Sequence, residues 1–483
     1  MNPKVVQRVS GLLLMLFSST MLPPLAVWGV FQEGQASPFL YGFLITLITG
    51  FVTWAPVRQD RSDLRLRDGF VIVVAFWTIL GTFGALPLFI STEPSLSITD
   101  ALFESFSGLT TTGATVITGL DELPKSILYY RQQLQWLGGL GIIVLAVAIL
   151  PMLGVGGMQL YRAETPGPIK DSKLAPRISE TAKALWYVYS GLTASCALAY
   201  WAAGMSVFDA ICHAFSTIAI GGFSTHDASM GWFDSSAINL IASVFMVIAG
   251  VNFALHFVAF SGRRVTHYWQ DTELKGYLAL LLFGISICFI GLVAASHYSD
   301  PDDALVEAIF QVVSFATTTG FTTADHSNWP TALPVLLLMA SFIGGCAGST
   351  AGGIKVVRVI LLLRQGVREL KRLVHPNAVI PVKMRHRVVD ARVIDAVWGF
   401  FAAYVGIFAL LLVLVLMTGL EPLSAFAAVA ACLNNLGPGL GEVANNMATV
   451  SDPAKWSLIL AMLLGRLEIF TLLVLFTPAF WRK

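Results

Sequence analysis

Residues 107–113 read Ser107-Gly108-Leu109-Thr110-Thr111-Thr112-Gly113, and the design of this stretch recurs three more times along the 483-residue chain. In each copy an alanine precedes the last glycine by 12 residues, and an Asp, Glu or Ser stands directly before that alanine. The match needs no gaps, so the sequence predicts four repeats of one structural unit. The three further copies end in Ala219-Ile220-Gly221-Gly222, Thr317-Thr318-Thr319-Gly320 and Asn434-Asn435-Leu436-Gly437.

The four copies lie within a chain that is dominated by long apolar stretches. The composition is 56% hydrophobic and 12% charged, which excludes a soluble enzyme, a disordered protein and a nucleic-acid binder. Ten stretches are long enough to cross a membrane as helices, and only the last is interrupted by charges, Arg466 and Glu468. The ten predicted spans are 9–32, 34–57, 69–92, 132–161, 184–208, 235–262, 276–299, 326–354, 396–420 and 456–481.

The basic residues predict how these spans are oriented. With both termini cytoplasmic, all but four of the 30 lysines and arginines fall on the cytoplasmic side; the exceptions are Lys125, Arg131, Lys455 and the intramembrane Arg466. The repeated copies sit in shorter charge-free stretches on the outer side. If these crossed the membrane, the bias would collapse, so they must enter and leave by the same face. The four re-entrant loops are 105–120, 210–226, 308–324 and 422–441.

Re-entrant backbone at membrane depth is tolerated where it lines an aqueous cavity, so these loops predict a pore. The Asp, Glu or Ser before each alanine opens a short helix, whose negative carboxyl end then points into the membrane and favours a cation. A glycine at the turn permits backbone conformations closed to other residues, so that carbonyls can replace a cation's hydration shell. Close helix packing is the alternative role of membrane glycines. It does not explain four at one offset.

These motifs resemble the filter segments of the Trk/Ktr/HKT superfamily of potassium transporters. Two opening helices before the repeats, together with Trp136-Leu137-Gly138-Gly139, Gly154-Val155-Gly156-Gly157 and Arg162-Ala163-Glu164, are similar to its TrkH branch. The resemblance covers essentially the whole chain. It implies that backbone carbonyls of the four loops hold potassium, and glycine at all four key positions is similar to the potassium-selective members. The implied potassium-binding residues are Thr111, Thr112, Gly113, Ile220, Gly221, Gly222, Thr318, Thr319, Gly320, Asn435, Leu436 and Gly437.

The fourth copy departs most from this pattern. Asn434, Asn435 and Leu436 replace the threonines, and Pro438 follows the glycine. The fourfold symmetry of ion coordination is therefore expected to weaken at this copy.

A second glycine-rich segment lies inside the predicted span 326–354. Five glycines among residues 344–353 disfavour a helix, and a phosphate-binding loop is excluded because Gly-Lys followed by Ser or Thr is missing. Close helix packing and a broken helix with a loop in the pore remain as interpretations. The second resembles the gating loop of the superfamily, which implies gate residues at Gly344, Gly345, Gly348, Gly352 and Gly353.

Arg466 lies within the last predicted span. A charge at mid-membrane is costly, so we expect Arg466 to have a specific role there. Glu468 is two residues away and therefore faces another side of the helix. Arg466 and Glu468 either pair with separate partners that hold helices together, or Arg466 opposes a cation beneath the filter. The resemblance favours the second role.

The sequence therefore predicts an all-α integral membrane protein with four span–pore-loop–span repeats around one pseudo-fourfold pore, preceded by two extra transmembrane helices. The expected units are 1–67 for the extra helices, then repeats 68–166, 167–265, 266–385 and 386–483. A secondary cation symporter that couples potassium to protons or sodium is the alternative, but such folds usually have inverted repeats and midplane carboxylates. No catalytic constellation is present, so we do not expect an enzyme.

The resemblance also implies where the protein works and what it binds. We expect potassium uptake across a bacterial inner membrane, with potassium as the transported ion, no organic cofactor and no nucleic-acid partner. A homodimer in the lipid bilayer and a cytoplasmic nucleotide-binding regulator of the TrkA type are implied as well. The run 355–392 carries ten basic residues and is the predicted docking surface for that regulator.

Overall fold

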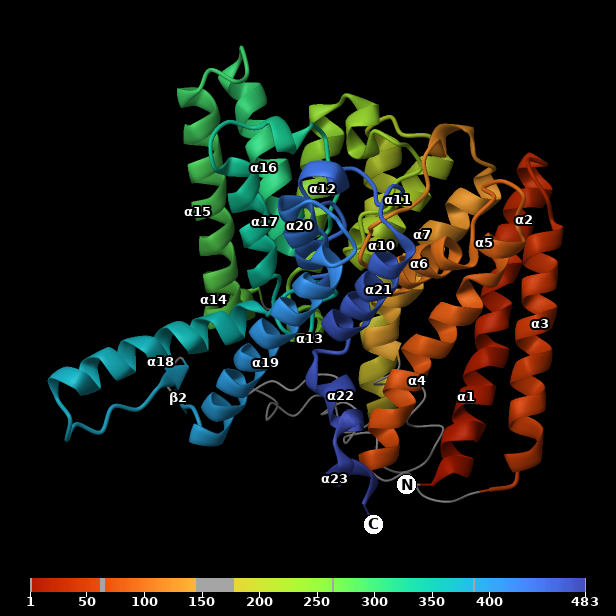
Figure 1. Cartoon of the computed structure of the whole chain (residues 1–483). Helices are drawn as coiled ribbons and strands as arrows, with labels where there is room; N and C mark the ends of the chain where they lie inside the picture. Colours follow the sequence, from red (N-terminus) through yellow and green to blue (C-terminus); the bar gives the residue numbers. More distant parts are fainter. Residues whose placement is uncertain (1, 61–65, 145–177, 263–264, 385–386, 483) are drawn as a thin grey trace.

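The structure is a computed structural model that describes residues 2–60, 66–144, 178–262, 265–384 and 387–482. These residues form a bundle of helices with one small hairpin of two strands (Figure 1). The helices are α1 Pro3–Ser18, α2 Leu22–Phe31, α3 Ser37–Trp54, α4 Leu66–Gly84, α5 Leu86–Ile90, α6 Ile98–Leu109, α7 Lys125–Val144, α10 Ile178–Ala202, α11 Val207–Ala219, α12 Ser236–Ala249, α13 Phe253–Gly262, α14 Thr266–Gln270, α15 Thr272–Ala294, α16 Pro301–Thr317, α17 Leu333–Ile343, α18 Val356–Val374, α19 Ala391–Leu416, α20 Pro422–Leu433, α21 Asp452–Arg466, α22 Phe470–Leu473 and α23 Pro478–Trp481.

The outer helices carry the surface of a membrane protein. Five helices of the described part are long and apolar enough to cross a bilayer, or seven spans if two bent helix pairs are each counted as one. Large apolar side chains on these helices face outward, such as Val52 of α3, Phe283 of α15 and Leu410 of α19. Because lipid tails are apolar, these exposed positions suit a bilayer.

The prediction of ten spans is wrong in two places, where a predicted span is sharply bent. The predicted span 235–262 is bent by 90° between α12 and α13, and the last span is bent by 105° between Arg466 and Phe470. The predicted span 326–354 contains the α-helix α17, Leu333–Ile343, followed by irregular backbone over 344–353, which agrees with the broken-helix interpretation of its glycines. At each break the chain needs irregular backbone, which a hydropathy pattern does not register. The predicted span 132–161 extends into residues 145–177, outside the described part.

Two helical spans precede the repeats, as predicted. The first of these, α1, packs against α3 at two glycines. A Cβ added to Gly11 would lie 2.8 Å from the carbonyl oxygen of Gly50, and one added to Gly50 would lie 2.9 Å from that of Gly11. The two backbones therefore touch, which is a common way to pack membrane helices in the absence of a hydrophobic driving force.

The prediction of an all-α membrane fold with four re-entrant loops is confirmed in its architecture. The exception is a hairpin in which β1 (Lys383–Met384) pairs antiparallel with β2 (Arg387–Val388) in the connection between α18 and α19. The boundaries between repeats stay predictions, and those at 166/167 and 385/386 lie outside the described residues.

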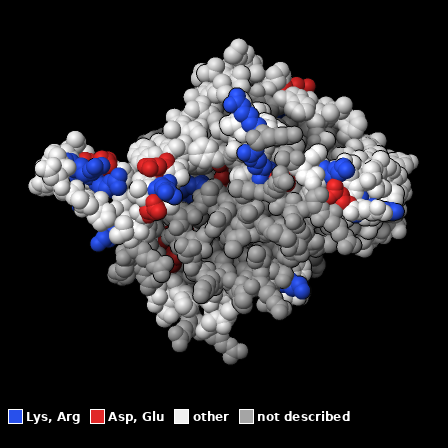
Figure 2. Space-filling view, turned by 90° about the horizontal axis from the view of Figure 1, so that it is seen from below, with Lys and Arg blue, Asp and Glu red and all other residues white. Residues whose placement is uncertain are grey.

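The two chain ends lie at the same end of the bundle, and α18 projects sideways from that end (Figure 1). Seen from below, Lys and Arg side chains are spread over this face and gather on the projecting arm (Figure 2). The arm is α18, whose basic residues include the exposed Lys371 and Arg372 and the half-buried Arg364. This end of the molecule is therefore the basic one.

Candidate ion pathway

The candidate pathway is built from four half-helices, α6, α11, α16 and α20, each of which is followed by an irregular return segment. The half-helices begin earlier than the sequence predicted. Ser97 and Ser206 cap α6 and α11, and their hydroxyls accept from the backbone N–H groups of Asp100 and Asp209. The two aspartates thus stand three residues after the cap and bond back to the serines at 2.8 and 2.7 Å. The serine hydroxyls donate these bonds to the aspartate carboxylates, so each cap is held by a Ser–Asp side-chain pair as well as by the bond from the backbone N–H.

The other two half-helices also begin ahead of the expected residue. Asp300 caps α16 and Glu421 caps α20, with proline as the first helical residue in both. The predicted starts at Glu307 and Ser424 therefore lie inside the helices. The acidic or hydroxyl residue before the alanine is a first-turn or later residue, and in all four copies the cap itself stands further upstream.

Each half-helix ends in the same backbone conformation. The last glycine of each copy has a positive φ, of 81° at Gly113, 79° at Gly222, 83° at Gly320 and 101° at Gly437. The residue two positions earlier is also left-handed in every copy, with φ of 52° at Thr111, 55° at Ile220, 66° at Thr318 and 54° at Asn435. L-residues rarely adopt this conformation, so four such pairs at one offset define a single turn that is used four times.

The four turns form a closed ring. A Cβ on Gly113 would lie 2.1 Å from the carbonyl oxygen of Gly221, and one on Gly222 would lie 2.1 Å from that of Thr319. The series continues at 1.9 Å from Gly320 to Leu436 and at 2.8 Å from Gly437 back to Thr112. Each glycine thus packs against the residue before the next glycine, in the order one, two, three, four and one. We call Gly113, Gly222, Gly320 and Gly437 the ring glycines.

This ring brings all twelve predicted binding residues to one place, at the ends of four half-helices. The partial negative charges of the helix ends and the backbone carbonyls of the turns are both suited to a dehydrated cation. A side chain at a ring glycine would be unfavourable for two reasons, because the positive φ strains an L-residue and because its Cβ would clash with the neighbouring carbonyl. This accounts for glycine at all four positions.

The fourth copy joins the ring through amides in place of hydroxyls. In copies one and three, hydroxyls pair across the turn, Thr110 with Thr112 at 2.8 Å and Thr317 with Thr319 at 2.7 Å. In copy four, the amide of Asn435 donates to the Thr112 hydroxyl at 2.9 Å and to the Met462 carbonyl at 3.1 Å. The substitution therefore ties copy four to copy one and to α21 without changing the turn.

The glycine-rich segment 344–353 crosses beneath this ring. The Thr350 hydroxyl donates to the Ile218 carbonyl at 3.0 Å, and the Gly352 N–H donates to the Thr318 hydroxyl at 2.7 Å. The Gly353 N–H donates to the Asn434 carbonyl at 3.1 Å. The segment therefore contacts the ends of the second, third and fourth half-helices at once, on the side of the ring away from the return segments.

Side chains from other elements hold the segment in place. Lys355 donates to the Ala351 carbonyl, and Glu273 of α15 accepts from the Ala347 N–H at 2.7 Å and the Val357 N–H at 3.1 Å. Arg466 donates to the Thr350 carbonyl at 3.0 Å and to the Gly138 carbonyl of α7 at 3.2 Å. Arg466 thus links the segment to the span that follows the first half-helix.

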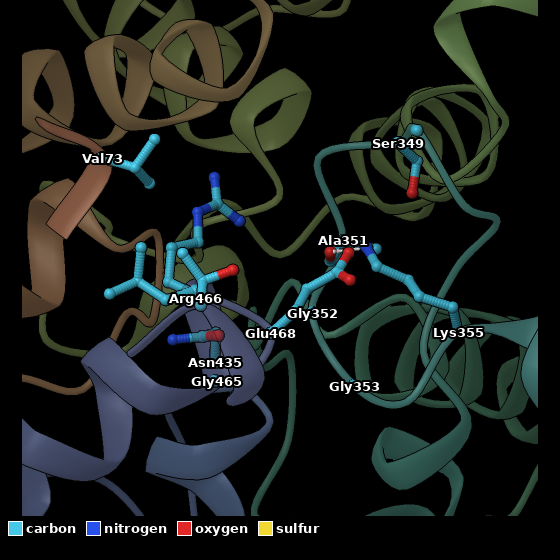
Figure 3. Close-up of a pocket in the computed structure, with 13 residues that line it drawn as sticks. Val73, Ser349, Ala351, Gly352, Gly353, Lys355, Asn435, Gly465, Arg466 and Glu468 are labelled. Carbon is cyan, nitrogen blue, oxygen red and sulfur yellow. Dashed lines mark hydrogen bonds between the residues drawn. The ribbon is translucent and has the colours of Figure 1, made fainter. Parts of the chain in front are cut away.

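Arg466 and Glu468 come from adjacent turns but point to different partners (Figure 3). The carboxylate of Glu468 pairs with Arg358 of α18 at 2.5 Å. The two residues line one cavity beneath the ring with Gly352, Lys355 and Asn435. The sequence predicted that they face apart, and it missed that the helix ends at Arg466, which is what turns Glu468 toward α18.

Four residues that support the ring or the glycine-rich segment were missed from the sequence or given another place. Arg131 was predicted to lie on the outer side, yet it is fully buried and forms an ion pair at 2.7 Å with the fully buried Glu104 behind loop one. Gln135 accepts from the Phe223 N–H and donates to the Gly221 carbonyl, and Glu273 anchors the glycine-rich segment. For Glu104 and Arg131 the sequence offers one indication, which is that the two charges flank the charge-free loop 105–120, although their spacing does not predict that they pair.

A histidine joins the first two return segments at the outer end of the pathway. The Nδ1 atom of His226 lies 2.5 Å from Oδ1 of Asp121, its Nε2 lies 3.6 Å from Oδ1 of Asp209, and its ring stacks on Trp232. Burial lowers the pKa of His226, but the hydrogen bonds and charges of Asp209 and Asp121 outweigh it, so the pKa is raised above 6.5. When it is protonated, the imidazole bridges the two carboxylates.

Four re-entrant half-helices that end in one ring of glycine turns, with carbonyls and negative helix ends facing one place, are suited to membrane proteins that transport cations. Comparison with known proteins agrees. The model of the TrkH family, described as a cation transport protein, matches residues 35–483. The chain is 59% identical over 485 residues to the Trk system potassium uptake protein TrkH of Vibrio parahaemolyticus, with 100% of both chains covered.

More distant relatives and a solved structure give the same assignment. The Trk system potassium uptake protein TrkG of Escherichia coli K12 is 42% identical over 99% of both chains. The crystal structure of the potassium transporter TrkH from Vibrio parahaemolyticus matches with a TM-score of 0.92 at 56% identity, covering 100% of both chains. The chain therefore belongs to the TrkH family of cation transport proteins.

Proposed function

We propose that this chain takes up potassium across a bacterial inner membrane, as the membrane subunit of a Trk-type system. The observation that carries this proposal is the closed ring of four glycine turns at the ends of four half-helices. The relatives that match over their full length are named potassium uptake proteins of the Trk system. Potassium is thus the transported ion.

In this proposal the ring is the selectivity filter. Backbone carbonyls of the four turns replace the hydration shell of a potassium ion, and the negative half-helix ends stabilise its charge. The ring diameter sets which cation is coordinated well. It is fixed because each ring glycine packs directly against the backbone of the next loop.

The segment 344–353 is the proposed gate. It contacts three half-helix ends beneath the ring, and Arg466 completes the fourth quadrant by bonding to Gly138. In this arrangement a cation that leaves the ring meets both the segment and a positive charge in a cavity where screening is weak. Conduction therefore requires that the segment moves aside.

The cytoplasmic partners follow from the same orientation. The basic end of the bundle, which carries both termini, faces the cytoplasm by the positive-inside rule. The basic arm α18 begins directly after the gate segment, and Glu468 beside Arg466 is paired with Arg358 on that arm. A TrkA-type nucleotide-binding regulator that docks on α18 thus moves the gate segment through this helix. A homodimer of the membrane subunit completes the proposed assembly.

The described carboxylates in the spans do not favour proton-coupled symport. Glu104 is paired with Arg131, Glu468 with Arg358, and Glu273 accepts two backbone N–H groups. Each of these carboxylates therefore already has a structural partner.

The proposal is tested by recording currents from the purified protein, with and without the regulator, in planar bilayers. We expect the reversal potential to follow the potassium gradient alone, unaffected by a pH or sodium gradient. A reversal potential that shifts with the proton or sodium gradient would replace the passive mechanism with coupled transport. Absence of potassium current in protein that is folded and inserted would overturn the proposed function.

A further inference from the structure

The four loops differ in what holds their return segments from behind. Nine residues before each ring glycine the half-helix carries Glu104, His213, Gln311 and Ala428, and all four side chains are fully buried. The first three reach across to the return segment of their own loop. We call this position, nine residues before each ring glycine, the clasp, because its side chain can bond the half-helix to the return segment. It holds a carboxylate in loop one, an imidazole in loop two, an amide in loop three and a methyl group in loop four.

At this aligned position Glu104 is the only charged side chain of the four, and it is held in a buried ion pair. Glu104 accepts from the Thr115 hydroxyl at 3.0 Å and from the Val116 N–H at 3.0 Å. Arg131 of α7 donates to the carboxylate at 2.7 Å and to the Thr115 hydroxyl at 3.1 Å. Thr115 stands two residues after the ring glycine Gly113, so the clasp begins directly behind the ring.

The same arginine also reaches the neighbouring loop. Arg131 donates to the Ser224 carbonyl at 3.1 Å, and its guanidinium lies 4.3 Å from the centre of the Phe223 ring. Ser224 stands two residues after Gly222, at the place that corresponds to Thr115. One guanidinium therefore fixes the return segments of loops one and two to each other.

At the other three positions the side chain is neutral, and His213 and Gln311 bond within their own loops; the return segments of these two loops are also bonded by the carboxylates of Asp209, to Thr225, and Glu307, to Thr323. His213 donates from Nδ1 to the Asp209 carbonyl, since that oxygen can only accept, and its Nε2 accepts from the Ser224 hydroxyl at 2.9 Å. The side-chain oxygen of Gln311, in the amide orientation that satisfies both ends, accepts from the Thr323 N–H at 3.1 Å. Behind loop four, Ala428 makes no such bond, and His326 donates to the Gly439 carbonyl at 3.1 Å.

We propose that the buried Glu104–Arg131 pair is a positioning device for ion selectivity, which sets the width of the ring between loops one and two. The proposal rests on the proposed potassium function. A buried ion pair contributes little net stability compared with apolar residues of the same volume, so stability alone does not explain a charged clasp here. Charge-assisted hydrogen bonds are short and directional, and the planar guanidinium fixes three acceptors at once. The pair therefore acts on the ion through the ring backbone without touching it.

The first test is Arg131→Lys, which keeps the positive charge beside Glu104 but loses the fork to Thr115 and Ser224. We expect the ratio of potassium to sodium permeability, from bi-ionic reversal potentials, to fall about tenfold, the equivalent of one lost charged hydrogen bond. The matched control is Glu33→Gln, which removes the exposed ion pair with Lys125 on the same helix. It should leave the ratio unchanged.

A second variant is designed to fold even if Arg131→Lys does not, so that the permeability ratio can still be measured without the ion pair. Glu104→Gln combined with Arg131→Gln leaves no buried unpaired charge and imitates the amide clasp of loop three. We expect it to assemble, to conduct potassium and to have a lowered permeability ratio. A wild-type ratio in the variant that folds, from either of these two designs, would overturn the inference. If the unmodified protein itself conducts no potassium, the proposed function fails instead, so the two failures are distinguishable.

Discussion

The ring glycines and the segment 344–353 are both glycine-rich and irregular at membrane depth, but they are held in different ways. Each ring glycine packs against the backbone of the next loop, and that loop is fixed to its half-helix. The segment is held by backbone bonds, such as that from the Cys346 N–H to the Gly250 carbonyl at 2.9 Å, and also by charged side chains from outside it, Glu273, Lys355 and Arg466. The packing of four loops around one ring cannot be broken singly, whereas the charged side-chain bonds can. The comparison indicates that the ring is rigid, whereas the segment can be displaced.

The largest effect is expected where a charge enters the ring. In Gly113→Asp, the new Cβ lies in the space of the Gly221 carbonyl and a carboxylate is buried among carbonyl oxygens. Potassium uptake should fall below about 1% of wild type. Uptake is measured in cells that lack other potassium transporters and is normalised to membrane-inserted protein. The control is Gly119→Asp, which also has a positive φ but no neighbouring atom within 4 Å of the added Cβ.

Shortening the glycine-rich segment should have the next largest effect, in the opposite direction. Deleting residues 348–351 removes the bonds to Ile218 and Arg466, so basal cation flux without the regulator should rise roughly tenfold or more. Flux is measured with potassium-loaded proteoliposomes. Deleting the exposed residues 376–379 after α18 serves as the control. A deletion variant that is folded but no leakier would mean that the segment only packs helices.

Removing one anchor of the segment should have a smaller effect. Arg466→Ala loses the bonds to Thr350 and Gly138 and the positive charge, so potassium flux should rise about threefold to tenfold. Arg466→Lys keeps the charge and should stay near wild type. Both are compared as uptake per folded protein. If Arg466→Ala misassembles or loses flux, the arginine is structural and the electrostatic barrier is refuted.

The smallest effect is expected at the outer histidine, which lies outside both regions. Because the folded pKa of His226 is raised above 6.5, its bridge to Asp121 and Asp209 stabilises the protein fully below that pH. The stabilisation is lost as the pH rises through the raised folded value. At low pH, His226→Gln should therefore melt about 1 °C below wild type, and at high pH the two should coincide. Melting curves across pH measure this, and ion selectivity should not change.

The sequence predicts the ring glycines well because each turn places the same demand on one residue, which must be glycine. A positive φ and a close carbonyl both demand glycine at the same offset, so Gly113, Gly222 and Gly320 carry their own signal. The extra helices, the re-entrant loops and the broken helix at 344–353 follow from hydropathy and glycine content for the same reason.

The missed features depend on contacts between distant segments. Arg131 and Glu104 are 27 residues apart and Glu468 and Arg358 are 110 apart, and neither spacing carries a sequence signal. The bend after Arg466 and the bend between α12 and α13 lie in apolar sequence, where a straight helix satisfies the same hydropathy. Predicting these pairs and bends requires the packing of the whole bundle.

The central claim, that the ring selects the cation, is tested most directly by the permeability ratio of Gly113→Ser beside that of Gly119→Ser. Both variants place an L side chain at a positive φ in loop one, but only the first meets a carbonyl oxygen of the ring. The account predicts that Gly113→Ser admits sodium and lowers the potassium to sodium ratio, while Gly119→Ser keeps the wild-type ratio. An unchanged ratio in correctly folded Gly113→Ser would contradict it.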